Sequence, residues 1–81
     1  MSVTVAALYR FAPLADAEDW RRRIHDHCLA SAIRGTILLA REGINGTVSG
    51  SAAAIATLVG MLRADPRLAA LEVKLSVADA H

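Results

Sequence analysis

The stretch that decides the fold is Gly35-Thr-Ile-Leu-Leu-Ala-Arg-Glu-Gly-Ile-Asn-Gly-Thr-Val-Ser-Gly-Ser51. Two runs rich in apolar and β-branched residues flank a short turn-forming core, Arg41 to Gly46. This pattern is typical of a β-hairpin. The turn centres either on Glu42-Gly43 or on Asn45-Gly46, and the second pair is the stronger turn signal. We favour Glu42-Gly43, because it leaves an intact alternating strand from Ile44 to Ser49.

The strand that follows the turn has two different faces. Ile44, Gly46 and Val48 point one way, because side chains alternate along a strand. The opposite face carries polar side chains, namely those of Asn45, Thr47 and Ser49. Glycine at 43 and 46 permits a positive φ or a close approach of two backbones, so these two residues are expected to be structural.

Working outward from the hairpin, an alternating strand is predicted from Val3 to Phe11, closed by Pro13. A helix from Ala17 to Ile33 follows, with Asp16 as its N-cap and Gly35 as its C-terminal stop. After the hairpin, Ser51 caps a second helix that ends at Asp65-Pro66. A last strand alternates from Leu71 to Val77. The expected core comprises Ile24, Ile55, Leu58, Val59, Leu62, Val73 and Leu75.

The order of elements, β-α-β-β-α-β, predicts the fold class. It is the ferredoxin-like α+β pattern, in which a four-stranded antiparallel sheet carries both helices on one face. Right-handed crossovers exclude most other arrangements of these elements. Residues 1–81 contain no internal linker or repeat, so we expect one small domain.

Composition excludes several classes of protein. Nine Lys/Arg and eight Asp/Glu give a net charge of +1, which is not the profile of an autonomous nucleic-acid binder. One cysteine excludes an intramolecular disulfide and fits a reducing compartment. Neither a secretory signal nor an apolar run long enough to span a bilayer is visible, so no membrane partner is expected.

Few residues offer catalytic or metal-binding chemistry. Cys28 is best interpreted as a small buried side chain on the first helix. His25, His27 and His81 lack the spacing of metal ligands, so no metal site is expected. The Arg21-Arg22-Arg23 triplet is interpreted as a solvated face with local ion pairs, although arginine also suits phosphate.

The face of the sheet away from the helices is the remaining candidate surface. RNA-binding sheets of this topology display aromatic side chains on their central strands. The chain has only Tyr9, Phe11 and Trp20, without the arrangement of such RNA-binding motifs. The apolar side chains of Thr36 to Ala40 instead suggest a sheet covered by another part of a larger protein.

Three segments resemble the rhodanese-related tRNA uridine hydroxylase family. They are the hairpin stretch quoted above, Ala7-Leu-Tyr-Arg-Phe11 and Leu62-Arg-Ala-Asp-Pro66. The resemblance implies an acylphosphatase-like first domain of a longer enzyme. It also implies the parent reaction, which is oxygen-dependent 5-hydroxylation of the wobble uridine of tRNA. The family's catalytic cysteine belongs to a downstream rhodanese domain, so Cys28 does not inherit that role.

The resemblance also suggests what this domain does. We expect it to assist tRNA placement or docking of the downstream rhodanese domain, in the cytoplasm, without catalytic residues or a cofactor of its own. The candidate RNA or domain-interface residues are Arg10, Arg41, Glu42, Asn45 and Thr47. Acylphosphatase activity is not expected, because the segment from Arg10 to Asp16 lacks the glycine-rich phosphate cradle. The alternative is a stand-alone ferredoxin-like module that binds a protein or a small ligand.

Overall fold

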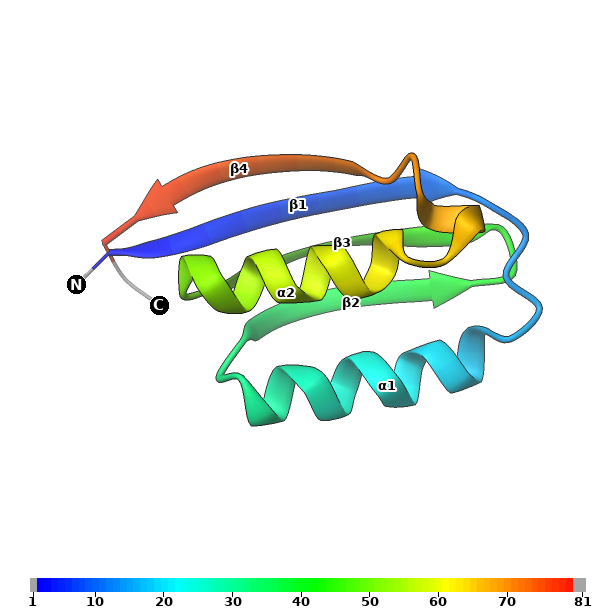
Figure 1. The fold of residues 1–81 in the computed structure, drawn as a ribbon, viewed down its shortest axis with the longest axis horizontal. Helices are drawn as coiled ribbons and strands as arrows, with labels where there is room; N and C mark the ends of the chain where they lie inside the picture. The colour runs from blue at the N-terminus through cyan, green and yellow to red at the C-terminus, as the bar shows by residue number, and fades with distance from the viewer. Residues whose placement is uncertain (1, 80–81) are drawn as a thin grey trace.

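A single sheet of four antiparallel strands, in the order β2-β3-β1-β4, organises the computed structural model, which describes residues 2–79 (Figure 1). The elements in chain order are β1 (Val3–Phe11), α1 (Ala17–Ala30), β2 (Arg34–Ala40), β3 (Gly43–Gly50), α2 (Ala52–Arg63), the 3₁₀ turn η1 (Pro66–Leu68) and β4 (Glu72–Ala78). This order and sheet confirm the predicted ferredoxin-like fold. His81 lies outside the described residues.

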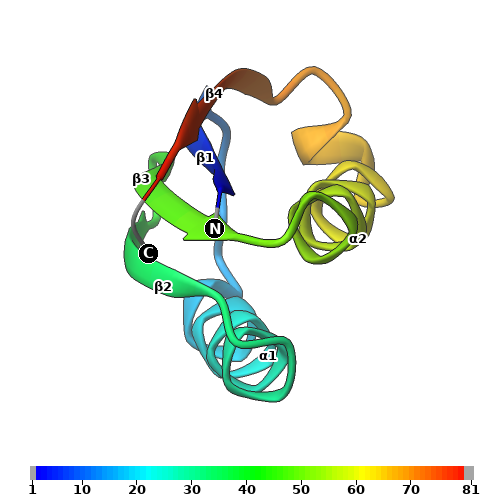
Figure 2. The ribbon, with the colours of Figure 1, turned by 90° about the vertical axis from the view of Figure 1, so that its left-hand side faces the viewer.

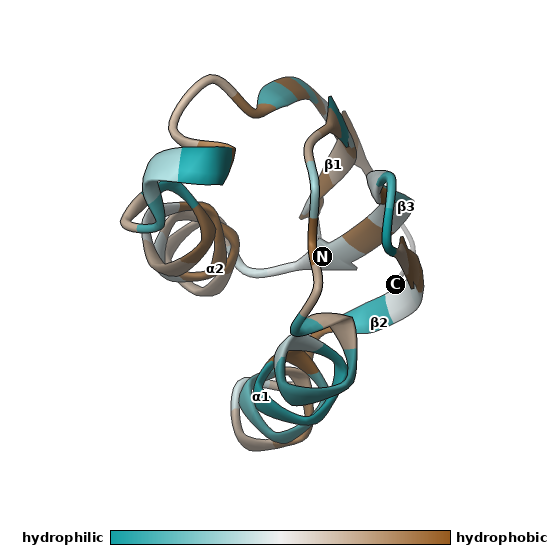
Figure 3. Cartoon of the chain, turned by 90° about the vertical axis from the view of Figure 1, so that its right-hand side faces the viewer, coloured by the Kyte–Doolittle hydropathy of each residue, from teal (hydrophilic) through white to brown (hydrophobic). Residues whose placement is uncertain are grey.

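Both helices lie on the same side of the sheet, and within residues 2–79 the other side carries no helix (Figure 2). The core forms between these two layers from buried apolar side chains of both helices, η1, the strands β1 to β3 and the loops, and Val73 of β4 packs partly buried against it. Its most deeply buried large members are Leu8, Leu14, Ile55, Leu58, Leu62 and Leu68. Helix α2 contacts the central strands β1 and β3, whereas α1 contacts β2. Accordingly α2 is largely hydrophobic and α1 mostly hydrophilic (Figure 3).

The hairpin turn lies one residue earlier than predicted. Ala40 pairs directly with Gly43, so the two turn residues are Arg41 and Glu42 rather than Glu42 and Gly43. Gly43 is already the first residue of β3. The predicted faces of β3 are nevertheless confirmed, because Ile44 and Val48 are buried.

Helix α1 ends at Ala30, three residues before the predicted end at Ile33. The chain leaves the helix at Ala32, whose φ of 55° is left-handed. The Ile33 N–H then donates to the Cys28 carbonyl at 2.9 Å, which is the six-residue closure of a Schellman motif. Gly35 is therefore not the helix stop and lies inside β2. Alanine rarely occupies the left-handed position, which is why the sequence pattern missed this ending.

The two predicted N-caps differ in outcome. Ser51 caps α2 as expected, since its hydroxyl accepts a hydrogen bond from the Ala54 N–H at 3.1 Å. Asp16 occupies the N-cap position of α1 but makes no side-chain capping bond. Its carboxylate is bound instead by Arg67, at 2.7 and 3.0 Å.

The predicted core is correct except at Leu75. Ile24, Ile55, Leu58 and Leu62 are buried, and Val59 and Val73 pack partly buried against them. Leu75 is 61% exposed. It pairs with the buried residue Ala6 and so shares its side of the sheet, but β4 is an edge strand, and Leu75 lines an open hollow between β4 and α2.

Replacing Ala32 by glycine is expected to stabilise the domain by about 0.5–1 kcal/mol. Glycine has no Cβ penalty in the left-handed region, and this gain exceeds the entropy that glycine adds to the unfolded chain. Urea denaturation measures the difference. The matched control is Ala30→Gly in the last turn of α1, which is expected to cost about 0.5–1 kcal/mol. A lower stability of Ala32→Gly than of the parent chain contradicts this account of the helix end.

Arg67 joins two segments that are far apart in the sequence. Its guanidinium binds both carboxylate oxygens of Asp16 and also donates to Asp65, at 2.7 and 3.0 Å. The side-chain hydrogen bond from Arg67 lowers the pKa of Asp65 to about 2, and the same interaction lowers the pKa of Asp16. The start of α1 is thereby linked to the end of α2 through η1.

These lowered pKa values predict a pH-dependent contribution to stability. The ionised carboxylates stabilise the fold above their unfolded-state pKa, about 3.9, and this contribution is lost as the pH falls towards 2. In Arg67→Ala, the free energy of unfolding should therefore change less between pH 5 and pH 2. Urea denaturation at a series of pH values measures the slope, with Arg22→Ala as the control. An unchanged slope in Arg67→Ala contradicts the assignment.

Candidate functional site: the hairpin and the open face of the sheet

The hairpin turn is held in place by the loop between β1 and α1. The Ala12 N–H donates to the Glu42 carbonyl at 2.9 Å, and the Leu14 N–H donates to the Arg41 carbonyl at 2.8 Å. Pro13, between them, has no N–H to donate. The turn therefore rests on rigid backbone, while the side chains of Arg41 and Glu42 are exposed.

The same two hydrogen bonds occupy backbone amides that an acylphosphatase-type phosphate cradle would need. A phosphate cradle in the loop after β1 needs free backbone N–H groups that point at the ligand. Here two of the amides of that loop, at Ala12 and Leu14, are already used by the hairpin. The loop thus serves to anchor the turn, and these two amides are not available to bind an anion.

The glycines of the hairpin have a steric role. Gly43 has a φ of 150°, and a Cβ there would lie 2.1 Å from the carbonyl oxygen of Arg10. At Gly46 a Cβ would lie 2.3 Å from the carbonyl oxygen of Thr36. Both contacts are with backbone, which has no room to yield. Only glycine therefore allows β1, β2 and β3 to pair at these positions.

The sheet side opposite the helices is called here the open face. Because directly paired residues share a face, and Ala6, Leu8, Ile44 and Val48 are buried, the alternate residues of each strand belong to the open face. From β2 to β4 these form three rows: Arg34, Ser49, Val5 and Ser76; then Thr36, Thr47, Ala7 and Lys74; then Leu38, Asn45, Tyr9 and Glu72. Phe11, Ala40 and Gly43 follow at the hairpin end.

The structure brings most of the predicted site residues together. Arg10, Glu42 and Asn45 line one hollow of about 200 Å³ beside the hairpin. Asn45 and Thr47 line a neighbouring hollow of about 410 Å³ on the open face. Arg41 lines neither hollow and lies at the turn. Arg10 pairs with Ile44 and therefore belongs to the helix side of β1, although its side chain is exposed.

Sequence reasoning expected apolar side chains on this surface from residues 36–40 of β2, but missed those of β1. Tyr9 and Phe11 both point to the open face from the central strand β1, with their rings 5.2 Å apart in an edge-to-face arrangement. Their exposed fractions are 42% and 68%, and Leu38 beside them is 64% exposed. The alternating pattern of β1 does place Tyr9 and Phe11 on one face of the strand. Both faces of β1 are apolar, however, so the pattern does not show which of them is buried.

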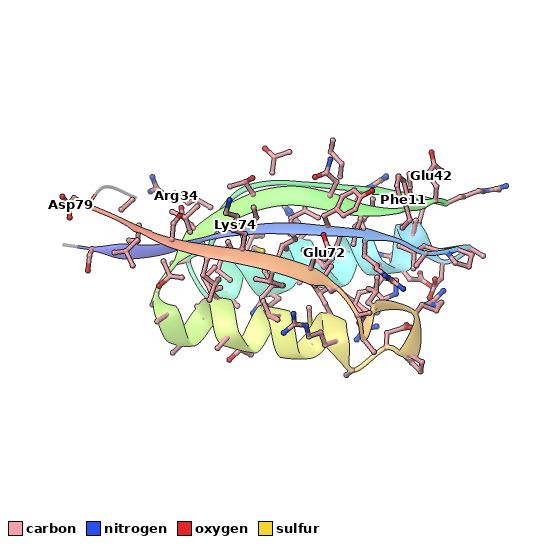
Figure 4. All side chains as sticks on the ribbon, turned by 90° about the horizontal axis from the view of Figure 1, so that it is seen from above. Phe11, Arg34, Glu42, Glu72, Lys74 and Asp79 are labelled. Carbon is pink, nitrogen blue, oxygen red and sulfur yellow. The ribbon has the colours of Figure 1, made fainter. Side chains whose placement is uncertain are left out.

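Charged side chains of both signs surround these apolar groups. Arg34 and Lys74 lie toward one end of the sheet, and Glu72 and Glu42 lie with Phe11 toward the other (Figure 4). None of these charges is buried. The open face therefore combines exposed apolar groups with exposed charges of both signs, which suits contact with a macromolecule.

The residues singled out on α1 have mainly structural roles. Cys28 packs partly buried against the core, and this burial raises the pKa of its thiol. Arg21 forms an ion pair with Glu18, and the Arg23 guanidinium lies 4.3 Å from the centre of the Trp20 ring. Within residues 2–79, no three His, Cys, Asp or Glu side chains are placed to hold a metal ion. In the same range, no helix has both the length and the apolar character needed to cross a bilayer.

Comparison with known proteins agrees with this architecture. Residues 3–81 match the family described as the UPF0176 acylphosphatase-like domain. The chain is 53% identical over 73 residues to proteins named tRNA uridine(34) hydroxylase from Brucella ovis, Brucella canis and Brucella suis. The aligned segment covers 90% of this chain but 24% of each relative, so the chain spans about a quarter of the length of the curated relatives that it matches. The chain belongs to the UPF0176 acylphosphatase-like domain family.

Proposed function

We propose that this domain is a non-catalytic, N-terminal module of a tRNA-modifying enzyme. The supporting observation is the 53% identity, over 90% of the chain, to proteins named tRNA uridine(34) hydroxylase. The parent reaction is then oxygen-dependent hydroxylation of the wobble uridine at C5, in the cytoplasm. The cysteine that serves the reaction belongs to a downstream rhodanese domain.

The proposed task of the module is to place the tRNA or to dock the rhodanese domain, through the end of the sheet that carries the hairpin. Arg10 and Arg41 are both exposed there, and Arg41 stands on a turn fixed by two backbone hydrogen bonds. Because the backbone of the turn is fixed, only the side chain of Arg41 has to be ordered on binding. Guanidinium groups bind phosphate and carboxylate oxygens well, so they suit either partner.

The isolated 81-residue chain is expected to have no enzymatic activity. Its free thiol is partly buried with a raised pKa, and two amides of its β1–α1 loop are already bonded to the hairpin. Assays with unmodified tRNA, with thiosulfate and cyanide, and with an acyl phosphate should each show no turnover above buffer. Turnover that is lost in Cys28→Ser or Glu42→Gln would show that the domain is catalytic.

The role of the hairpin is tested in the full-length enzyme that carries this domain. For the double variant Arg10→Ala/Arg41→Ala, we expect the KM for tRNA to rise roughly five- to thirtyfold with kcat little changed. This estimate takes about 0.5–1 kcal/mol for each exposed phosphate contact. The matched control is Arg22→Ala on α1. The thermal stability of the 81-residue chain should be unaffected, because both side chains are exposed.

The kinetic pattern separates the two tasks. A lowered kcat with an unchanged KM indicates docking of the rhodanese domain instead of tRNA placement. If both kinetic parameters are unchanged in the double variant, the hairpin end has neither role.

A further inference from the structure

The open face leaves large apolar side chains in water. Tyr9, Phe11 and Leu38 lie close together on β1 and β2, exposed by 42%, 68% and 64%. A contiguous exposed group that contains two aromatic rings marks an interaction surface more often than isolated exposed residues do. The occupant of this surface must match both its shape and its charges.

The charges of the open face divide it into two halves. Arg34 and Lys74 belong to the two rows nearest the start of β2, whereas Glu72 belongs to the next row and Glu42 to the hairpin turn (Figure 4). Arg41 on the same turn and Asp79 beyond the end of β4 are also exposed, and with them the six charges sum to zero, with +1 in one half and −1 in the other. A nucleic-acid surface needs a net positive charge, so this pattern favours a protein partner with charges of both signs.

We propose that the occupant is a second copy of this chain, packed open face to open face. The two-fold axis lies in the plane midway between the two sheets and runs across the strands, perpendicular to them. It passes between the row of Ala7 and the row of Tyr9. Each strand then faces the same strand of the other copy, running in the opposite direction. Such an interface is isologous, because the same surface is used twice. It also corresponds to aligned packing of two sheets about 10 Å apart.

This operation pairs opposite charges. Lys74 and Glu72 exchange rows, so each Lys74 faces Glu72 of the second copy, and the contact occurs twice. Arg34 is brought to the hairpin end of the second copy, where Glu42 lies on the turn. The face is therefore complementary in charge to itself, which neither an all-basic nor an all-acidic surface could be.

The same operation pairs large side chains with small ones. Tyr9 comes to face Ala7, Phe11 comes to face Val5, and Leu38 comes to face Thr36. Asn45 and Thr47, both polar, come to face each other across the axis. Facing positions that alternate in size allow two layers to interdigitate without voids. The proposal goes beyond the function proposed above and does not rest on it.

The area of the open face sets the expected affinity of the dimer. Four strands about 4.8 Å apart, and rows spread over about 25 Å, give roughly 500 Å² for each copy. Interfaces of that size belong to the weak, transient class. We therefore expect a dimer of the 81-residue chain in the micromolar to millimolar range, weakened by 0.5 M NaCl because its charge pairs are exposed.

Charge exchange on β4 tests the proposal directly. Sedimentation equilibrium should show that Lys74→Glu and Glu72→Lys each raise the dimer dissociation constant by about tenfold or more, since each change places like charges opposite one another twice. The double variant Lys74→Glu/Glu72→Lys should restore the parent value. Arg22→Glu on α1 is the charge-matched control and should leave the constant unchanged.

A second pair of variants tests the apolar contact. Phe11→Ser on the open face should weaken dimerisation, whereas Leu29→Ser, which removes an equally exposed side chain from α1, should not. Circular dichroism verifies that each variant keeps its fold. A chain that is monomeric at all concentrations, or single and double charge variants that behave alike, overturns the proposal.

Discussion

The structure depends on the close approach of two backbones at the hairpin. A Cβ on Gly43 would lie 2.1 Å from the carbonyl oxygen of Arg10, so β1 and β3 approach there to a distance that only glycine permits. This contact lies at the end of the central pairing of the sheet, which runs from Phe11 and Gly43 to Thr4 and Gly50. A shift of one residue would turn Ile44 and Val48 away from the helices and expose two of the buried apolar side chains that the sheet contributes to the core.

Once the register is set, the hairpin segment divides its residues between two tasks. Its glycines and its buried apolar residues build the fold, whereas Glu42, Asn45 and Thr47 point into solvent. The backbone of the turn also has a structural role, since its carbonyls accept hydrogen bonds from the amides of the β1–α1 loop. The fold is acylphosphatase-like. In this domain, however, two backbone amides of the β1–α1 loop, where a phosphate cradle would lie, bind the hairpin instead. The shared fold therefore does not by itself carry acylphosphatase activity to this domain.

The parts of the fold that could be predicted from the sequence are those set by local chemistry. Alternation located the strands, and a hydroxyl at Ser51 located the start of α2. The predictions of the turn position and of the Asp16 cap were wrong because contacts with residues distant in the sequence decide them. The carbonyl of Arg41 is bonded by Leu14, which helps to place the turn one residue earlier than the glycine pattern suggested. Asp16 is drawn away from its capping role by Arg67, which lies 51 residues further along the chain.

The candidate site was only partly accessible to sequence reasoning, for a related reason. Asn45 and Thr47 were placed correctly, because their neighbours Ile44 and Val48 are clearly apolar. In β1 both faces are apolar, so alternation alone could not show that Ala6 and Leu8 face the helices and leave Tyr9 and Phe11 outside. That choice is made by tertiary packing, since α2 contacts β1 on the side where Ala6 and Leu8 are buried.

The position of β4 has a consequence for the colloidal behaviour of the domain. It lies at one end of the strand order, and Val73, Leu75 and Val77 make it a strand of high β-propensity. Edge strands of this kind are templates for the addition of further strands, which is the route to fibrils. Glu72 and Lys74 interrupt the apolar residues and oppose such growth. Glu72 and Lys74 therefore have two effects: they pair with a second copy across the open face in the proposed dimer, and they oppose the repeated addition of strands at the edge.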